Sequence, residues 1–129
     1  MQLVDRVDFL GGMPPQQIRS ACAGAHIFVI PQDSDYFFSP LKLYEAMAMG
    51  LPVVTSSLKL FQTYRDAGLV HSIPGRGPES LAMGIREVAE NPLFAQELRE
   101  RGLKEAEQRS WLRRAENVLR FIADLRRES

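Results

Sequence analysis

The 129-residue sequence predicts an α/β fold in which helices flank a mostly parallel sheet of about four strands. Two observations lead to this prediction. Short apolar runs rich in β-branched residues alternate with longer segments of helical periodicity. The chain is also 45% apolar and 25% charged, which suffices for one domain with a sizeable core. We therefore expect residues 1–129 to form a single unit built from successive strand and helix segments.

The N-terminal third predicts a strand, a helix and a second strand. The apolar run 7–10 leads into Gly11-Gly12, and Pro14-Pro15 opens a segment with apolar residues at helical spacing. The continuous apolar run 26–30 then stops at Pro31. Such a run is typical of a strand that is buried on both faces, so we expect it in the interior of the sheet.

The next segment predicts a helix followed by a third strand. Ser39 has the side chain of an N-cap, and Pro40 suits the first helical position. We expect the helix over residues 41–49, ended by Gly50 in left-handed geometry. The run 52–55 then predicts the strand.

The C-terminal half predicts one more strand and several helices. A weak helical segment over 58–68 precedes a fourth strand over 69–73. A helix begins at Pro78, and Asn91-Pro92 interrupts the chain before two further helices. The last helix, from Ser110, has an apolar stripe opposite its arginines, formed by Trp111, Ala115, Val118, Ile122 and Leu125.

Charge and cysteine content exclude several classes of protein. Sixteen basic residues balance sixteen acidic ones, so no net field favours nucleic acid or an anionic membrane. Acids are nearly as frequent as arginines in the C-terminal helices, and a solvated face is the simpler interpretation of those arginines. Cys22 is the single cysteine, and no Cys and His residues have zinc-ligand spacing, so we expect no metal and a cytoplasmic location.

The segment 31–56 carries the chemistry that we expect. Ligands of a doubly wound sheet bind beyond the carboxyl ends of its strands, and the helix near Pro40 begins at that edge. Its free amides, those of Leu41 and Lys42, suit a phosphate or diphosphate. Ser39 is ambiguous, because its hydroxyl can cap the helix or face the phosphate.

Glu45 lies in the same helix and is the leading candidate for a ligand contact. Its carboxylate can accept two hydrogen bonds from a ribose diol. The alternative, which spacing alone favours, is an exposed helix glutamate in water.

These residues belong to a recognisable pattern. The segment SPLKLYEAMAMGLPVV resembles the donor-binding signature of retaining glycosyltransferases of family 4, which have the GT-B fold of two facing Rossmann-like domains. The flanking segments VDFLGGMPPQQIRSACAGAHIFVIPQ and GLVHSIPGRGPESLAMGIREVAENP resemble the same family. The resemblance covers essentially the whole chain, as the distal part of the C-terminal, donor-binding domain.

The resemblance implies roles for individual residues. Glu45 matches the family's glutamate on the donor ribose, and Ser39, Pro40, Leu41 and Lys42 fall where the helix N-terminus binds the diphosphate. Phe37 stands in the region of the family's first glutamate, so a role carried by that carboxylate is in doubt. Gly12, with its neighbour Gly11, falls near the base, although two glycines can equally form a tight turn.

The resemblance also implies that a nucleotide-sugar donor binds without a metal cofactor, and that the chain is incomplete on its own. No segment before Val7 matches the family's Gly-Arg and Lys-Gly pair, and no acceptor domain is present. Strands 1 and 2 of the Rossmann-like order would then be absent from the middle of the sheet. We therefore expect a companion chain or a homo-oligomer, and peripheral membrane contact is compatible with the family. The alternative function is a non-catalytic interaction or regulatory module.

Overall fold

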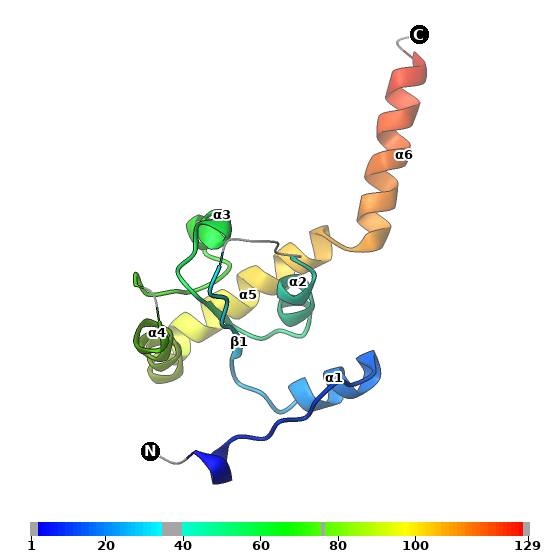
Figure 1. Cartoon of the computed structure of the whole chain (residues 1–129). Helices are drawn as coiled ribbons and strands as arrows, with labels where there is room; N and C mark the ends of the chain where they lie inside the picture. Colours follow the sequence, from blue (N-terminus) through cyan, green and yellow to red (C-terminus); the bar gives the residue numbers. More distant parts are fainter. Residues whose placement is uncertain (1–2, 35–39, 76, 128–129) are drawn as a thin grey trace.

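The computed structural model describes residues 3–34, 40–75 and 77–127, and its fold is α/β, as predicted (Figure 1). Helices make up most of the chain, and the sheet is smaller than the sequence suggests. In chain order the elements are η1 (Val4–Arg6), α1 (Pro15–Cys22), β1 (Phe28–Ile30), α2 (Leu41–Ala48), β2 (Val53–Thr55), η2 (Lys59–Phe61), α3 (Gln62–Asp66), α4 (Pro78–Glu90), α5 (Pro92–Gln108) and α6 (Trp111–Arg127).

The sheet consists of β1 and β2, which pair in parallel from Phe28 opposite Val53 to Ile30 opposite Thr55. The predicted fourth strand over 69–73 is reduced to one bridge, in which His71 pairs with Val54 on the other edge of β2. The amide of Thr55 donates to the His71 carbonyl at 2.8 Å. The prediction of about four strands is therefore too high for the described residues.

The strand expected over 7–10 is wrong. The structure has the 3-10 turn η1 just before these residues and extended chain without strand pairing through them, and Phe9 is 94% exposed. A strand needs a neighbour that accepts its backbone hydrogen bonds, and none of the described residues lies beside this run.

The prediction that the run 26–30 lies in the sheet interior is also wrong. Among the described residues β1 pairs only with β2, and it leaves Phe28 and Val29 half-buried while Ile30 is buried. Phe28 and Ile30 both bond toward β2, through Pro52 and Ser56. Backbone groups alternate sides along a parallel strand, so the N–H and C=O of Val29 point to the open edge.

Helix α2 (Leu41–Ala48) agrees with the predicted helix over 41–49 to within one residue at its end, and differs in the position of Pro40. Pro40 precedes the helix, and its carbonyl accepts the Tyr44 amide at 3.0 Å, so Pro40 is the N-cap residue and not the first helical one. The expected capping role of Ser39 lies outside the described residues. Gly50 ends the helical segment with φ of 70°, a left-handed value that glycine adopts without strain.

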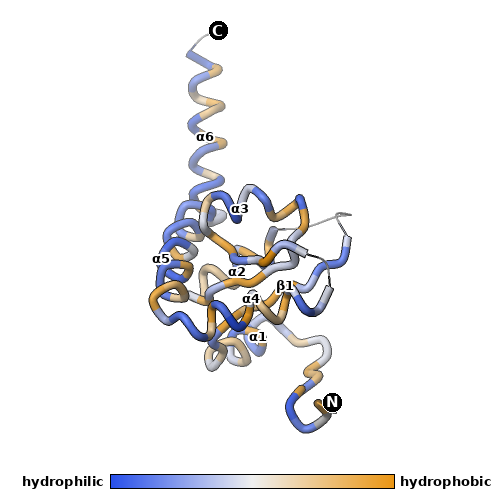
Figure 2. Tube along the Cα trace, turned by 90° about the vertical axis from the view of Figure 1, so that its left-hand side faces the viewer, coloured by the Kyte–Doolittle hydropathy of each residue, from blue (hydrophilic) through white to orange (hydrophobic). Residues whose placement is uncertain are grey.

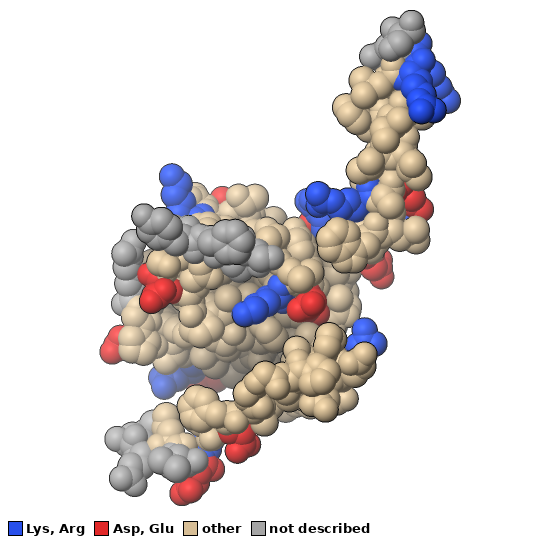
Figure 3. Space-filling model, turned by 45° about the vertical axis from the view of Figure 1, so that its right-hand side comes forward, with Lys and Arg blue, Asp and Glu red and all other residues tan. Residues whose placement is uncertain are grey.

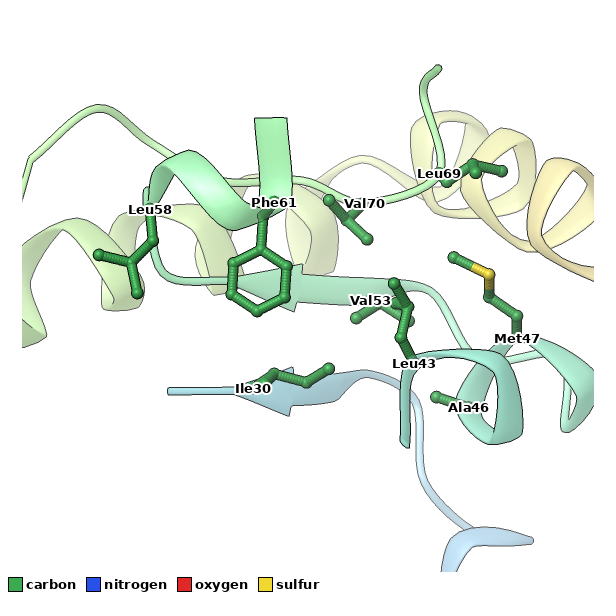
Figure 4. Close-up of a cluster of buried hydrophobic side chains, with 9 residues drawn as sticks. All are labelled: Ile30, Leu43, Ala46, Met47, Val53, Leu58, Phe61, Leu69 and Val70. Atoms are coloured by element: carbon green, nitrogen blue, oxygen red, sulfur yellow. The ribbon is translucent and has the colours of Figure 1, made fainter. Parts of the chain in front are cut away.

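The core lies on both faces of β2. On the α2 side, one cluster joins strands, helix α2 and the segment 58–70 (Figure 4). Its buried residues are Ile30, Leu43, Ala46, Met47, Val53, Leu58, Phe61, Leu69 and Val70. On the opposite face Val54 packs with Val88 of α4 and Leu98 of α5. The alternation of Val53 and Val54 between these clusters follows from the pleat of the strand.

Close packing at two glycines brings the helices onto this core. A Cβ at Gly102 of α5 would lie 3.1 Å from the Cγ of Met47, and one at Gly84 of α4 would lie 3.2 Å from the Cγ1 of Val54. Larger residues at these positions would push α5 from α2 and α4 from the sheet. At the sheet edge, His71 Nε2 lies 2.9 Å from Glu87 Oε2 on α4, and the His71 ring packs edge-on against Phe94.

The predicted helices at the C-terminus are confirmed. The Asn91 side chain caps α5 by accepting the Phe94 amide at 3.2 Å, and Ser110 accepts the Arg113 amide at the start of α6 at 3.3 Å. Helix α6 extends away from the body of the molecule (Figures 1 and 2). Within the described part of the chain, no helix is both long enough and apolar enough to cross a membrane.

Candidate functional site

Two hollows lie near the residues that the sequence singles out. The smaller one, of about 300 Å³, lies at the carboxyl ends of β1 and β2, where the loops after both strands meet the N-terminus of α4. Its walls include polar side chains and two glycines of positive φ, Gly75 and Gly77. This hollow occupies the edge at which parallel α/β sheets bind ligands.

The larger hollow is a groove of about 810 Å³ between α1 and the exposed side of α2 and α5. Apolar side chains, among them Ile18, Met49 and Leu103, form much of its wall. Glu45 lies on this wall, together with the basic residues Arg19 and Arg99. In the space-filling view the N-terminal segment and α1 stand apart from the body (Figure 3).

The predicted residues of α2 lie on one exposed face of the helix. Leu43, Ala46 and Met47 are buried against the core, which turns the opposite side outward. Leu41, Lys42 and Glu45 are exposed there. Leu41 and Glu45 are one helical turn apart, so they lie beside each other on this face.

Of the other predicted site residues, the structure describes Gly12 and Pro40. Gly12 lies three residues before α1, in exposed chain, and is not among the residues that line either hollow. Ser39 and Phe37 lie outside the described residues. Pro40 is exposed at the start of α2.

Behind α2, two tyrosines attach this helix to α3. The rings of Tyr44 and Tyr64 meet edge to face, with centroids 6.3 Å apart. Burial, which is the larger cause, and a hydrogen bond to Tyr44 together raise the pKa of Tyr64 to about 12. Near them, Arg109 Nε donates to Glu105 Oε1 at 2.8 Å, and this bond raises the pKa of the Arg109 guanidinium. Arg109 is therefore held in its charged form near the tyrosines, and the carboxylate of Glu105 balances its charge.

Hydroxyl groups at the strand ends were not singled out by the sequence. Ser56 accepts the Gln32 amide at 2.9 Å and so joins the loops that follow β1 and β2. Ser80 donates to the Gly77 carbonyl at 3.1 Å at the start of α4. Thr55 is 1% exposed, and its Oγ1 has no hydrogen-bond partner in the structure. The signal that could have found them is the position of Ser and Thr at the end of a strand, just after it, or in the first turn of a helix.

No metal centre is evident within the described ranges, since no three His, Cys, Asp or Glu side chains there could hold an ion.

Comparison with known protein families identifies a match. The model of the family described as "Glycosyl transferases group 1" matches residues 1–91 of the 129-residue chain. The matched range contains β1, α2 and β2, all residues around the smaller hollow, and those of the groove except Arg99 and Leu103. A search of curated proteins finds no match.

Proposed function

The chain belongs to the group 1 glycosyl transferases, and from this membership we propose that it supplies the binding site for a nucleotide-diphosphate sugar donor. The observation that carries the proposal is the exposed face of α2. On it Leu41, Lys42 and Glu45 lead from the helix N-terminus toward the groove. The family supports a role in glycosyl transfer in general, and the donor and the residues that hold it are our proposal.

The N-terminus of α2 provides the diphosphate contact. The first amides of a helix have no intrahelical acceptor, and the helix dipole adds positive potential at this end. Pro40 has no N–H, so the amides of Leu41 and Lys42 are the first donors. The Lys42 ammonium is exposed beside them and adds a positive charge.

Glu45 provides the ribose contact. Four residues at the helical rise separate it from Leu41 by about 6 Å along the axis. A donor whose diphosphate meets the first turn can therefore extend its ribose one turn further along the helix. There the carboxylate accepts hydrogen bonds from the two ribose hydroxyls.

In the proposed reaction, the bond between the anomeric carbon and the diphosphate oxygen breaks, and its electron pair leaves with the nucleoside diphosphate. The oxygen of an acceptor hydroxyl bonds to the anomeric carbon on the same face, with retention, and its proton passes to the leaving diphosphate. The amides of α2 stabilise the charge that develops on that diphosphate. We propose no metal in this step.

A second function, binding to a companion chain, is favoured by the open edge of β1. The Val29 backbone groups point to this edge, and the groove beside α1 has an apolar wall. A chain that adds a strand at this edge would pair with the Val29 backbone groups. It could also bring the basic side chains that neutralise the leaving diphosphate, which would make the two functions parts of one enzyme.

Thermal melting with UDP, GDP and ADP tests the donor site. Ligand at 100 times its dissociation constant stabilises the folded state by about 2.7 kcal/mol, a rise in melting temperature of several degrees. We expect such a rise for one nucleotide. Glu45→Ala should reduce it, because losing the paired hydrogen bonds costs about 1–3 kcal/mol of binding.

Glu90→Ala is the matched control, since Glu90 is an exposed helix glutamate far along α4. It should respond to nucleotide as the unaltered chain does. A nucleotide response that survives in Glu45→Ala would remove Glu45 from the site. A folded chain that responds to no nucleotide would favour the interaction module.

A further inference from the structure

Among the described residues, two buried side-chain hydroxyl groups have no hydrogen-bond partner. They are the Thr55 Oγ1, at the end of β2, and the Ser72 Oγ, in the segment 69–73. Thr55 as a whole is only 1% exposed. Buried polar groups in proteins are almost always hydrogen-bonded, so an unpaired one indicates a place where another group binds. We call these two side chains the hydroxyl pair.

The register of the sheet places the two side chains next to each other. His71 pairs with Val54 of β2. Its N–H donates to the Val53 carbonyl, and its C=O accepts the Thr55 amide. In a parallel pair the register advances by one residue on both chains, so Ser72 comes opposite Thr55. The hydroxyl pair therefore lies on two neighbouring segments at their carboxyl ends.

Both hydroxyl groups lie on the α2 side of the sheet. Val53 and Val70, which precede the hydroxyl pair by two residues on the two segments, both belong to the core cluster on that side. His71 and Ile73 instead face Gly84 of α4. Side chains alternate between the two faces along extended chain, so the hydroxyl pair returns to the face of the two valines.

The spacing of the hydroxyl pair fits one bridging oxygen. The two oxygens do not bond to each other. Neighbouring strands lie about 4.8 Å apart. An oxygen that makes two hydrogen bonds of about 2.8 Å at the tetrahedral angle joins atoms about 4.5 Å apart. One further hydroxyl group between the two side chains would therefore bond to both.

From these observations we infer that the hydroxyl pair is a binding site for one neutral O–H group. A serine or threonine hydroxyl both donates and accepts but carries no charge, and the core cluster on this side is apolar, so an ion would not be favoured there. Two sources have this chemistry, a water molecule and a hydroxyl of the donor's sugar. The second source rests on the proposed function.

The location of the site suits both sources. The carboxyl ends of parallel strands form the edge at which α/β sheets bind ligands, and α2, the helix proposed to hold the diphosphate, lies on the same face. A water here would join the end of β2 to the segment 69–73, which keeps only one bridge to the sheet. A sugar hydroxyl that replaced the water would make the same two bonds.

Melting of single and double variants of the full chain tests for a bridging water. Thr55→Val and Ser72→Ala each remove one partner and strand the other, so each should lower the melting temperature by several degrees. The double variant removes the whole site and should melt no lower than either single variant, so the two effects should not add. Thr63→Val, at an exposed threonine of α3, is the control and should melt as the unaltered chain does.

Paired titrations test for the sugar hydroxyl. The probes are UDP with UDP-glucose, GDP with GDP-mannose, and ADP with ADP-glucose. If a sugar hydroxyl fills the site, Thr55→Val should weaken binding of one nucleotide-sugar at least about fivefold and change binding of its nucleoside diphosphate by less than about twofold. Non-additive melting with equal binding in the variant and the unaltered chain would assign the site to water alone.

One combination of results would overturn the inference. If the two single variants shift the melting temperature additively, in either direction, and no nucleotide-sugar distinguishes Thr55→Val from the unaltered chain, the two hydroxyl groups share no bound group. Failure of the donor site has a different signature. The unaltered chain would then bind none of the six probes, while the melting of the variants would still decide whether the hydroxyl pair binds water.

Discussion

At the scale of single residues, folding clearly raises the pKa of Tyr64. It is partly buried behind α2, and its hydroxyl bonds to Tyr44, which itself contacts Tyr64 edge to face. Both effects favour the neutral phenol. The positive charge of Arg109 opposes them only weakly, so the pKa of Tyr64 remains about 12 in the folded chain.

This pKa predicts an alkaline loss of stability. An unfolded tyrosine has a pKa of about 10, so the folded state holds the Tyr64 proton more tightly between pH 10 and 12. The stabilisation is fully present below pH 10 and falls as pH rises through this window, by less than the about 2–3 kcal/mol of the full shift, because Tyr64 is partly exposed and solvent screens its interactions. Urea unfolding at pH 9, 10 and 11 should show the fall, and Tyr64→Phe should flatten it. An equally steep fall in that variant would assign the effect to other groups.

Some residues of the site can be predicted from the sequence, and others cannot because their partners are distant in the chain. Helical spacing alone is enough to place Leu41, Lys42 and Glu45 on one face of α2. Gly102 could not be found in this way, because its importance depends on Met47, which is 55 positions away in the sequence. The same is true of Tyr64, whose partner Tyr44 lies on another helix.

At the scale of elements, the contact between α2 and α5 holds the site helix in place. Met47 lies within the core cluster and against Gly102, and Ala106 packs against the same cluster. The exposed face of α2 can carry ligand-binding residues because its other face is fixed in this way. A change at Gly102 therefore acts on the site without touching it.

Gly102→Val should destabilise the chain. Its side chain would overlap Met47, and overpacking of a core costs about 1–3 kcal/mol, which lowers the melting temperature by several degrees. Gly24→Val is the control, because a Cβ there meets nothing within 4 Å and the backbone is not left-handed. Equal melting temperatures for the two variants would show that the helices do not approach as closely as the structure has them.

Elements were predicted best where their partners are near in sequence. The unit from β1 through α2 to β2 needs only residues 28–55, and the sequence predicts all three elements. The runs 7–10 and 69–73 have strand composition as well, but the first has no neighbour among the described residues and the second keeps one bridge. Apolar periodicity reports what a segment can form, and pairing decides what it does form.

At the scale of the whole molecule, the folded body and the exposed segments are distinct. Buried side chains fall between Ile30 and Gly102, whereas α1 and α6 contain none among the described residues. The sequence could not predict this division, because both helices have apolar stripes that resemble core-facing ones. Because α1 has no buried residue, the groove between it and helices α2 and α5 stays open.

Removal of α6 should leave the body intact. A chain of residues 1–110 should unfold with a free energy within about 0.5 kcal/mol of the full chain, since no buried side chain is lost. Calorimetry can measure this, with residues 1–90 as the contrast, because that chain also lacks α5. A large loss of stability in the 1–110 chain would mean that α6 supports the fold.

The position of α5 also affects how the chain is made. During synthesis the strands and α2 emerge first, yet Met47 of α2 packs against a helix that begins only at Pro92. Until about forty more residues have left the ribosome, an apolar face is open to water and to other nascent chains. Chaperone demand should therefore be highest while translation passes through the segment between β2 and α5.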